Sequence, residues 1–190
     1  ASGEPIYSTA AESKIICEEN NADRIRYMIS QVFNIPLCAD RKLQEEYEIM
    51  SRRLNRCVER SSIMIPFGVT TTLTLEKDSP MLFIHTEFEN NARDHRLRML
   101  FPTDFSTETH LADAVFDVVE RLDIPGENWQ NPSRCQRMQY FAAAEDVKEG
   151  LAVINRGNYE YEILPERKQI AVTLLRSVGE LGDWGDFPTP

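Results

Sequence analysis

Apolar and polar side chains alternate along many short stretches of this 190-residue chain. Alternation with a period of two places successive side chains on opposite faces of a strand, so each stretch predicts a half-buried β-strand. The stretches are 15–18, 25–32, 69–75, 81–88, 97–101, 114–120, 138–143, 150–155, 159–164 and 170–175. Turn-forming Gly, Pro, Asn or Asp residues separate them. Short strands joined by turns predict an all-β fold, an antiparallel β-sandwich.

The segment 40–59 departs from this pattern. Its apolar residues, among them Leu43, Tyr47 and Met50, recur at three- and four-residue steps between many charges, which is the period of an amphipathic helix. Asp40 would cap that helix. A charged extended excursion between strands is the alternative, because the apolar stripe is thin. The sequence therefore predicts one sandwich domain over residues 1–190, with a helical or extended insertion at 40–59 and at most one short helix.

The densest group of charges lies between two of the predicted strands, in the sequence FENNARDHRLRMLFPT at 88–103. Asn90, Asn91 and Asp94 tolerate the left-handed or Asx-turn conformations that a chain reversal needs. His95 beside Asp94 is either an oriented imidazole for acid/base work or a brace for the turn. The cluster as a whole predicts a solvated corner or a polar contact surface.

Composition excludes several classes of partner. With 31 acidic and 21 basic residues the net charge is -10, which opposes attraction to nucleic acid and to anionic lipid. The longest apolar runs span a few residues, far short of the roughly 20 needed to cross a bilayer, so no membrane segment is expected. The four cysteines form no CxxC pair, which predicts reduced thiols and a cytoplasmic location.

Catalytic and metal-binding motifs are missing from the sequence. It contains no GxSxG, no glycine-rich phosphate loop and no HExxH. Its three histidines, His85, His95 and His110, do not stand at metal-ligand spacing from one another. We therefore expect this chain to hold no metal and to contain no complete catalytic set.

Several motifs in order carry a resemblance to a known family. They are VTTTLTLEKDSPMLFIHTEFENNARDHRLRMLFPT at 69–103, FDVVER at 116–121, GLAVINRG at 150–157 and IAVTLLRSVGELG at 170–182. This part of the chain resembles the C-terminal β-sandwich region of glycoside hydrolase family 38, the α-mannosidases. The opening GEPIYS at 3–8 is similar to a loop just ahead of that sandwich.

The resemblance implies a supersandwich-like fold and a noncatalytic role. Family members hydrolyse α-mannosidic bonds with retention, assisted by zinc or another divalent metal that is held in an N-terminal catalytic barrel. That region has no counterpart in this chain. We therefore expect a fragment that supports the catalytic domain of the same polypeptide and lines the pocket for a mannoside substrate. A stand-alone carbohydrate-binding sandwich and a purely structural interaction domain are the alternatives.

The resemblance also nominates individual residues. Arg176, in LLRSVG, corresponds to an arginine that reaches toward the active site, although an edge arginine extending to water is an equal alternative. Tyr7 could stack on a sugar or hydrogen-bond to it, with core packing as the alternative. For the corner cluster we favour bracing or interface contacts over sugar contact, since alternation places two of its arginines opposite Leu97 and Met99. The cluster comprises Arg93, Asp94, His95, Arg96 and Arg98.

Overall fold

The computed structural model describes residues 4–39, 59–124 and 134–177. These residues divide into two compact units, one running up to His95 and including Ser177, the other spanning 96–176. Three antiparallel four-stranded sheets account for the fold, which confirms the predicted all-β class. The only helices among the described residues are two 3-10 turns, Ser8–Ala10 and Pro165–Arg167. The single domain over 1–190 stays a prediction, and 40–58 of the predicted insertion lies outside the described residues.

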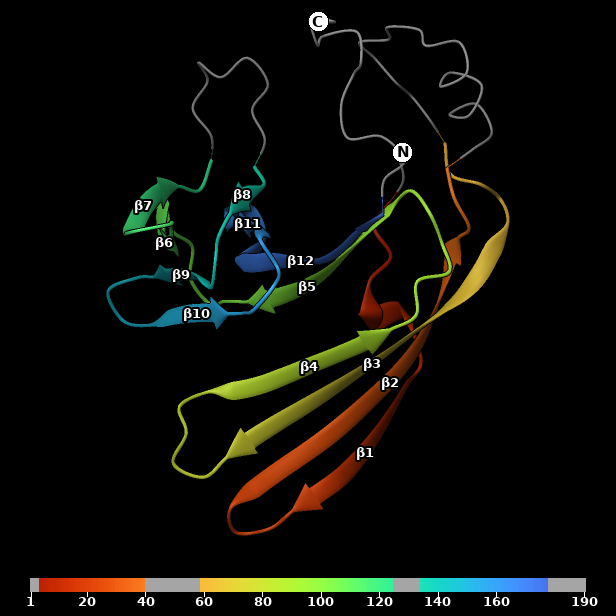
Figure 1. The fold of residues 1–190 in the computed structure, drawn as a ribbon, viewed down its shortest axis with the longest axis horizontal. Coiled ribbons are helices and arrows are strands. Elements are labelled where there is room, and N and C mark those ends of the chain that lie inside the picture. The colour runs from red at the N-terminus through yellow and green to blue at the C-terminus, as the bar shows by residue number, and fades with distance from the viewer. Residues whose placement is uncertain (1–3, 40–58, 125–133, 178–190) are drawn as a thin grey trace, which may run out of the picture. The chain divides into compact units, whose positions relative to one another are not determined.

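The first unit is one sheet of long strands, in the order β1-β2-β3-β4 (Figure 1). Its strands are β1 (Ser13–Asn20), β2 (Arg24–Pro36), β3 (Met64–Glu76) and β4 (Leu82–Phe88). At the first hairpin, the side-chain oxygen of Asn21 accepts the backbone N–H groups of Asp23 and Arg24, both at 2.9 Å. This Asx turn closes β1 onto β2, as the asparagines there predict. The register shifts between Cys17 and Glu19, where β1 carries a bulge.

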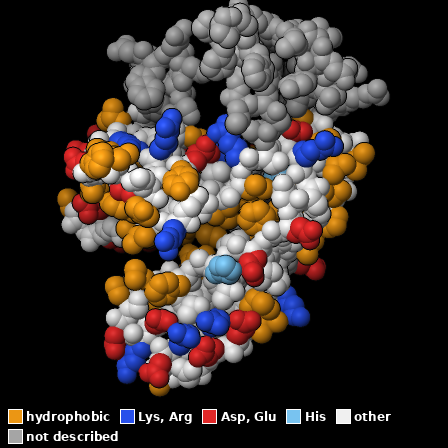
Figure 2. Space-filling model, in the orientation of Figure 1, with side chains coloured by type: hydrophobic (Ala, Val, Ile, Leu, Met, Phe, Trp, Pro, Cys, Tyr) orange, Lys and Arg blue, Asp and Glu red, His pale blue; other side chains and the backbone are white. Residues whose placement is uncertain are grey.

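The register of this sheet places the charged residues that it pairs on one face. Cross-strand partners share a face, so the pairs Ile25–Leu75 and Leu75–Leu82 form one apolar row on one side. On the other side, Arg24 and Glu76 form an ion pair at 2.7 Å. Figure 2 shows charged side chains of both signs over these strands on the side turned to the viewer. One face of the sheet thus carries the charged residues, mixed with apolar ones such as Met28 and Phe83, and the paired residues of the other face include no Lys, Arg, Asp or Glu.

The second unit contains the other two sheets, ordered β10-β9-β6-β7 and β5-β12-β11-β8 (Figure 1). The first of them consists of β6 (Thr109–Asp113), β7 (Val118–Leu122), β9 (Phe141–Glu145) and β10 (Gly150–Ile154). The second consists of β5 (His95–Pro102), β8 (Gln136–Arg137), β11 (Glu160–Leu164) and β12 (Gln169–Ser177). Consecutive strands are therefore shared between two layers, as in a sandwich.

A hydrophobic core joins these two sheets. Ala112 and Ala142 come from one sheet and Ile163 and Ile170 from the other, and all four are buried. Small alanines on one side leave room for larger side chains from the opposite sheet, which keeps the interior filled. Alternation along β11 and β12 sends the intervening residues to the outer face of their sheet. That outer face carries the charged side chains described below.

Several strand predictions needed revision in detail: β8 (Gln136–Arg137) was not predicted, and the strand expected at 138–143 is β9, which begins only at Phe141. The range 114–120 was expected to be one strand, but β7 begins at Val118, and the N–H of Ala114 bonds to the carbonyl of Asp117 at 2.7 Å to close a turn. β6 was not predicted, because the buried polar residues His110 and Asp113 interrupt its apolar pattern. No helix among the described residues is long and apolar enough to cross a membrane.

Candidate functional site

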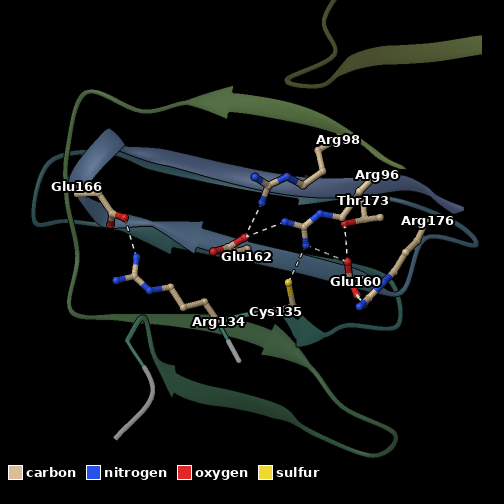
Figure 3. A network of polar contacts seen from close by, with 9 residues as sticks. All are labelled: Arg96, Arg98, Arg134, Cys135, Glu160, Glu162, Glu166, Thr173 and Arg176. Carbon is tan, nitrogen blue, oxygen red and sulfur yellow. Dashed lines mark hydrogen bonds and ion pairs between the residues drawn. The ribbon is translucent and has the colours of Figure 1, made fainter. Parts of the chain in front are cut away.

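Charged side chains from three neighbouring strands meet on the outer face of the β5-β12-β11-β8 sheet (Figure 3). Arginines project from β5 and from the end of β12, and glutamates project from β11, which is separated from β5 by β12. We call this group the arginine–glutamate ladder. Its members are Arg96, Arg98, Glu160, Glu162, Thr173 and Arg176.

Alternation explains why the two arginines of β5 and the two glutamates of β11 share a face, whereas Arg176 joins them from the end of β12 through its contact with Glu160. Arg96 and Arg98 are separated by Leu97, and Glu160 and Glu162 are separated by the buried Tyr161. Residues two apart on a strand point the same way, so each strand contributes a pair of like charges to the surface. Because the arginine strand and the glutamate strand lie in the same sheet, the pairs complement each other in sign.

The ion pairs within the ladder range from 2.5 to 3.9 Å. Arg98 Nη1 lies 2.5 Å from Glu162 Oε2, and Arg96 Nη2 lies 3.9 Å from the same oxygen. Arg96 Nη1 is 3.5 Å from Glu160 Oε1 and 3.0 Å from the Sγ atom of Cys135. Arg176 Nη1 reaches Glu160 Oε2 at 2.6 Å. Each guanidinium therefore has a carboxylate partner within the unit.

Glu160 is the centre of this network. Its carboxylate accepts a hydrogen bond from Thr173 Oγ1 at 2.8 Å, in addition to its contacts with two arginines. Burial opposes the charge of Glu160, but the hydrogen bond from Thr173 and the guanidinium of Arg176 outweigh it and lower the pKa of the carboxyl. Glu160 therefore remains ionised at neutral pH and holds Arg176 close to the sheet.

The structure places Arg176 at the outer end of the ladder. Its side chain is 52% exposed, and its ion pair among the described residues is the one with Glu160. The guanidinium is paired and also open to solvent, and a contact of Arg176 with substrate stays a prediction. Arg134 makes a similar exposed pair with Glu166 at 2.6 Å, from the segment before β8 (Figure 3). Such exposed pairs contribute little to stability, which leaves their arginines available for other contacts.

The corner cluster predicted from sequence is split by the fold. Only Arg96 and Arg98 join the ladder. Asp94 adopts the left-handed conformation expected of it, with φ of 56°, and its Oδ2 accepts the backbone N–H of Ala39 at 3.1 Å. The backbone N–H of Arg93 donates to the carbonyl of Leu37 at 2.8 Å. Arg93 and Asp94 thus tie the corner to the end of β2.

His95 does not pair with Asp94. Its ring meets Phe67 edge-on, with ring centres 5.7 Å apart, and both of its ring nitrogens are buried without a hydrogen-bond partner. Tyr7 lies in the first unit, immediately before the 3-10 turn Ser8–Ala10, and is partly exposed. Tyr7 belongs to the first unit and Arg176 to the second, so the contacts of each are described within its own unit.

A buried hydrogen-bonded triad was missed by sequence reasoning. His110 Nδ1 lies 2.6 Å from Asp123 Oδ1, and His110 Nε2 lies 2.6 Å from the hydroxyl of Tyr161. Burial lowers the pKa of His110 in spite of the opposing effect of Asp123. The neutral ring then donates a hydrogen bond from Nδ1 to the carboxylate of Asp123 and accepts one at Nε2 from the hydroxyl of Tyr161. No spacing motif links these residues, which come together only when the sheets pack.

This triad resembles a catalytic arrangement, but its burial gives it a structural role. The side chains of His110 and Asp123 are 0% and 1% exposed, so no substrate atom can approach them. Thr107 completes the network by donating to Asp123 Oδ2 at 2.8 Å. The triad therefore joins β6 to β11 across the sandwich and satisfies polar groups that would otherwise be costly to bury.

The described residues do not provide a metal site. No group of three or more His, Cys, Asp or Glu side chains among them is arranged to hold an ion. The ladder offers guanidinium and carboxylate groups at a surface, which can bind hydroxyl groups or a complementary polar surface. Its one hydroxyl–carboxylate pair, Thr173 with Glu160, helps to hold the arginines in place, and we assign the ladder no catalytic step.

Comparison with known proteins identifies the family of this chain. Residues 4–180 match the model of the glycosyl hydrolases family 38 C-terminal domain. A protein of Halalkalibacterium halodurans, named "Putative mannosylglycerate hydrolase", is 40% identical over 185 residues, which cover 97% of this chain and 20% of that protein.

Two solved structures from Enterococcus faecalis are similar as well. An α-mannosidase from strain V583 matches with a TM-score of 0.86 at 40% identity, over 92% of this chain and 20% of that one. A glycosyl hydrolase family 38 protein matches with a TM-score of 0.82 at 39% identity, over 95% of this chain and 21% of that one. This chain thus spans about a fifth of the length of these relatives, and it belongs to the C-terminal domain family of glycosyl hydrolase family 38.

Proposed function

We propose that this chain is the noncatalytic C-terminal part of an α-mannosidase-like glycoside hydrolase. The observation that carries the proposal is the match of residues 4–180 to the family's C-terminal domain. The chain covers 20% of the length of the relatives that it matches. The parent enzyme would hydrolyse α-mannosidic bonds with retention, and a divalent metal such as zinc would be held by its catalytic domain. The described part of this chain holds no candidate ligand group for that metal.

The chain would act by supporting the catalytic domain and by lining the sugar pocket. The exposed position of Arg176, held by Glu160 at 2.6 Å, suits an arginine that reaches beyond its own unit. Fixing the guanidinium through one carboxylate leaves its other N–H groups free to meet sugar hydroxyls or a second carboxylate. Arg96 and Arg98 are less exposed and bridge β5 to β11, so bracing remains the role that we propose for them.

An activity comparison tests the whole proposal. The 190-residue chain and its full-length parent are assayed with a chromogenic α-mannoside, with and without added zinc. Activity of the parent alone is expected. Metal-dependent turnover by the chain itself would contradict the noncatalytic role, and measurable affinity of the chain for mannosides without turnover would favour a stand-alone carbohydrate-binding domain.

The role of Arg176 is tested in the full-length protein. Arg176→Ala should lower kcat/KM by about tenfold or more if its guanidinium contacts the substrate, which corresponds to roughly 1.4 kcal/mol of lost transition-state stabilisation. Arg134→Ala is the matched control, because Arg134 makes a comparable exposed pair with Glu166 at 2.6 Å. Equal kcat/KM for the wild type and Arg176→Ala, with the fold intact, would remove Arg176 from the pocket.

A further inference from the structure

The two carboxylate oxygens of Glu160 make different kinds of contact (Figure 3). Oε1 accepts a hydrogen bond from Thr173 Oγ1 at 2.8 Å and lies 3.5 Å from Arg96 Nη1. Oε2 lies 2.6 Å from Arg176 Nη1. One oxygen is therefore held by side chains of the sheet, and the other holds the exposed arginine at the end of β12.

Thr173, Glu160 and Arg176 lead from the interior of the second unit to solvent. Thr173 is buried, the side chain of Glu160 is 25% exposed and that of Arg176 is 52% exposed. Thr173 belongs to β12 and Glu160 to the neighbouring β11, which are the two inner strands of their sheet. A buried, β-branched side chain on an inner strand has few rotamers, so its hydroxyl is a firm support for the carboxylate beside it.

A firm support matters for an arginine at the surface. Exposed arginines sample many rotamers, and fixing one of them on a ligand costs conformational entropy when the ligand binds. The contact with Glu160 restricts Arg176 through a single nitrogen, Nη1, before any ligand arrives. If the carboxylate were itself mobile, this restriction would be weak. The hydrogen bond from Thr173 therefore extends the order of the sheet to the guanidinium.

The charge of Glu160 fits the same arrangement. Burial opposes the ionised carboxylate, but the hydrogen bond from Thr173 and the guanidinium of Arg176 outweigh burial and lower the pKa of Glu160. The hydroxyl of Thr173 thus supports the carboxylate in its ionised form, which is the form that attracts a guanidinium.

We propose that Thr173, acting through Glu160, is a positioning residue for mannoside hydrolysis by the parent enzyme. Thr173 itself does not touch the substrate. It orients the carboxylate of Glu160, and that carboxylate orients the guanidinium of Arg176. The inference rests on the proposed function, because it takes Arg176 to contact the substrate. A group that is misplaced by about 1 Å can slow an enzyme by as much as about 100-fold, so the loss of one support is measurable.

The test is a double-mutant cycle in the full-length protein, assayed with a chromogenic α-mannoside. Thr173→Val keeps the shape of the side chain and removes its hydroxyl, so it should lower kcat/KM by about threefold to tenfold in the wild-type background. In the Arg176→Ala background the same substitution should leave kcat/KM unchanged, because the group that Thr173 positions is gone. Thr173→Ser keeps the hydroxyl and should retain the wild-type value.

A second threonine of the same unit provides a matched control. Thr107 Oγ1 donates to Asp123 Oδ2 at 2.8 Å, the same distance as in the pair of Thr173 with Glu160, but within the buried triad. Thr107→Val and Thr173→Val should both lower the Tm, since each removes a hydrogen bond to a carboxylate. Only Thr173→Val should lower kcat/KM by a factor that depends on Arg176.

Three results would overturn the proposal. If Thr173→Val lowers kcat/KM by the same factor in both backgrounds, the hydroxyl acts through the fold alone. If Thr173→Val has no effect while Arg176→Ala lowers kcat/KM, Thr173 is not a positioning residue and the proposed role of Arg176 stands. If Arg176→Ala leaves kcat/KM unchanged with the fold intact, both proposals fail. Should Thr173→Val not fold, Glu160→Gln takes its place in the cycle with the same expectations.

Discussion

In the second unit two sheets enclose Tyr161 and Ile170, exposed to 0% and 1%, whereas in the first unit Ile15 keeps 62% of its surface on a single sheet. Both units are built from the same alternating strands. The difference is the number of layers. In the part of the chain that the structure describes, the first unit contains a single sheet with no second sheet of that unit packed on it, so apolar side chains such as Ile15 keep much of their surface exposed. Alternation therefore predicts strands in both units, but it does not tell which face becomes a core.

The largest expected contrast between the units comes from the same substitution made in each. In the 190-residue chain, Ile170→Ala should lower the free energy of unfolding by about 2–5 kcal/mol, because it leaves a cavity in a closed core. Ile15→Ala should cost less than about 1 kcal/mol, because this side chain is largely solvated already. Urea unfolding of the two variants checks the comparison. Equal losses would mean that the first unit is as well packed as the second.

The buried triad predicts a pH dependence in the second unit. Burial lowers the pKa of His110 below its ordinary value of 6.5, so the unfolded chain binds a proton there more readily than the folded one. The resulting stability is fully present above pH 6.5 and is lost as pH falls toward the lowered pKa. The slope cannot exceed about 1.4 kcal/mol per pH unit for one proton.

The free energy of unfolding of the wild type and of His110→Gln, determined between pH 7 and pH 5, measures this pH-dependent contribution of His110. The wild type should lose stability with falling pH and the variant should lose less over the same range. His85→Gln is the control, since His85 in the first unit is 73% exposed and makes no buried contact. Parallel curves for the wild type and His110→Gln would show that the triad does not titrate with folding.

The smallest expected effect is a difference in stability between two ion-pair networks, the arginine–glutamate ladder of the second unit and the Arg24–Glu76 pair of the first. Glu160→Gln should reduce stability by about 1 kcal/mol, because Glu160 serves Thr173 and two arginines in a partly buried setting. Glu76→Gln in the first unit should change it little, because Glu76 and its partner Arg24 are about 40% exposed, at 42% and 39%. Thermal melts of both variants suffice. A larger loss from Glu76→Gln would invert the order of the two networks.

The sequence predicted features that depend on neighbouring residues, such as strands and turns. It did not predict contacts between residues that are far apart in the sequence. The first hairpin and the left-handed Asp94 follow from alternation and from turn chemistry within a few residues. The ladder was half visible, because alternation placed Arg96 and Arg98 on one outer face. Their partner Glu162 lies 64 residues from Arg98 in the sequence, and no local pattern identifies it.

The buried triad was beyond sequence reasoning for a different reason. From the sequence, a histidine on a strand is interpreted as an exposed residue or a metal ligand. No pattern in the sequence around His110 indicates Asp123 or Tyr161 as its partners. Burying three polar groups together is favourable only when all are hydrogen-bonded, and that condition is met across two sheets. The same polar residues also concealed β6, since they occupy positions where a core strand is expected to be apolar.

The bulge in β1 has a consequence for aggregation. β1 and β4 are the outer strands of the four described in this sheet, and an outer strand offers unpaired N–H and C=O groups to another chain. The bulge between Cys17 and Glu19 bends β1 and breaks the regular ladder that a fibril would need. β4 pairs with β3 in unbroken register from Leu82 to Phe88. Fibril growth from a partly unfolded chain should therefore start at β4, and a proline in that strand should suppress it.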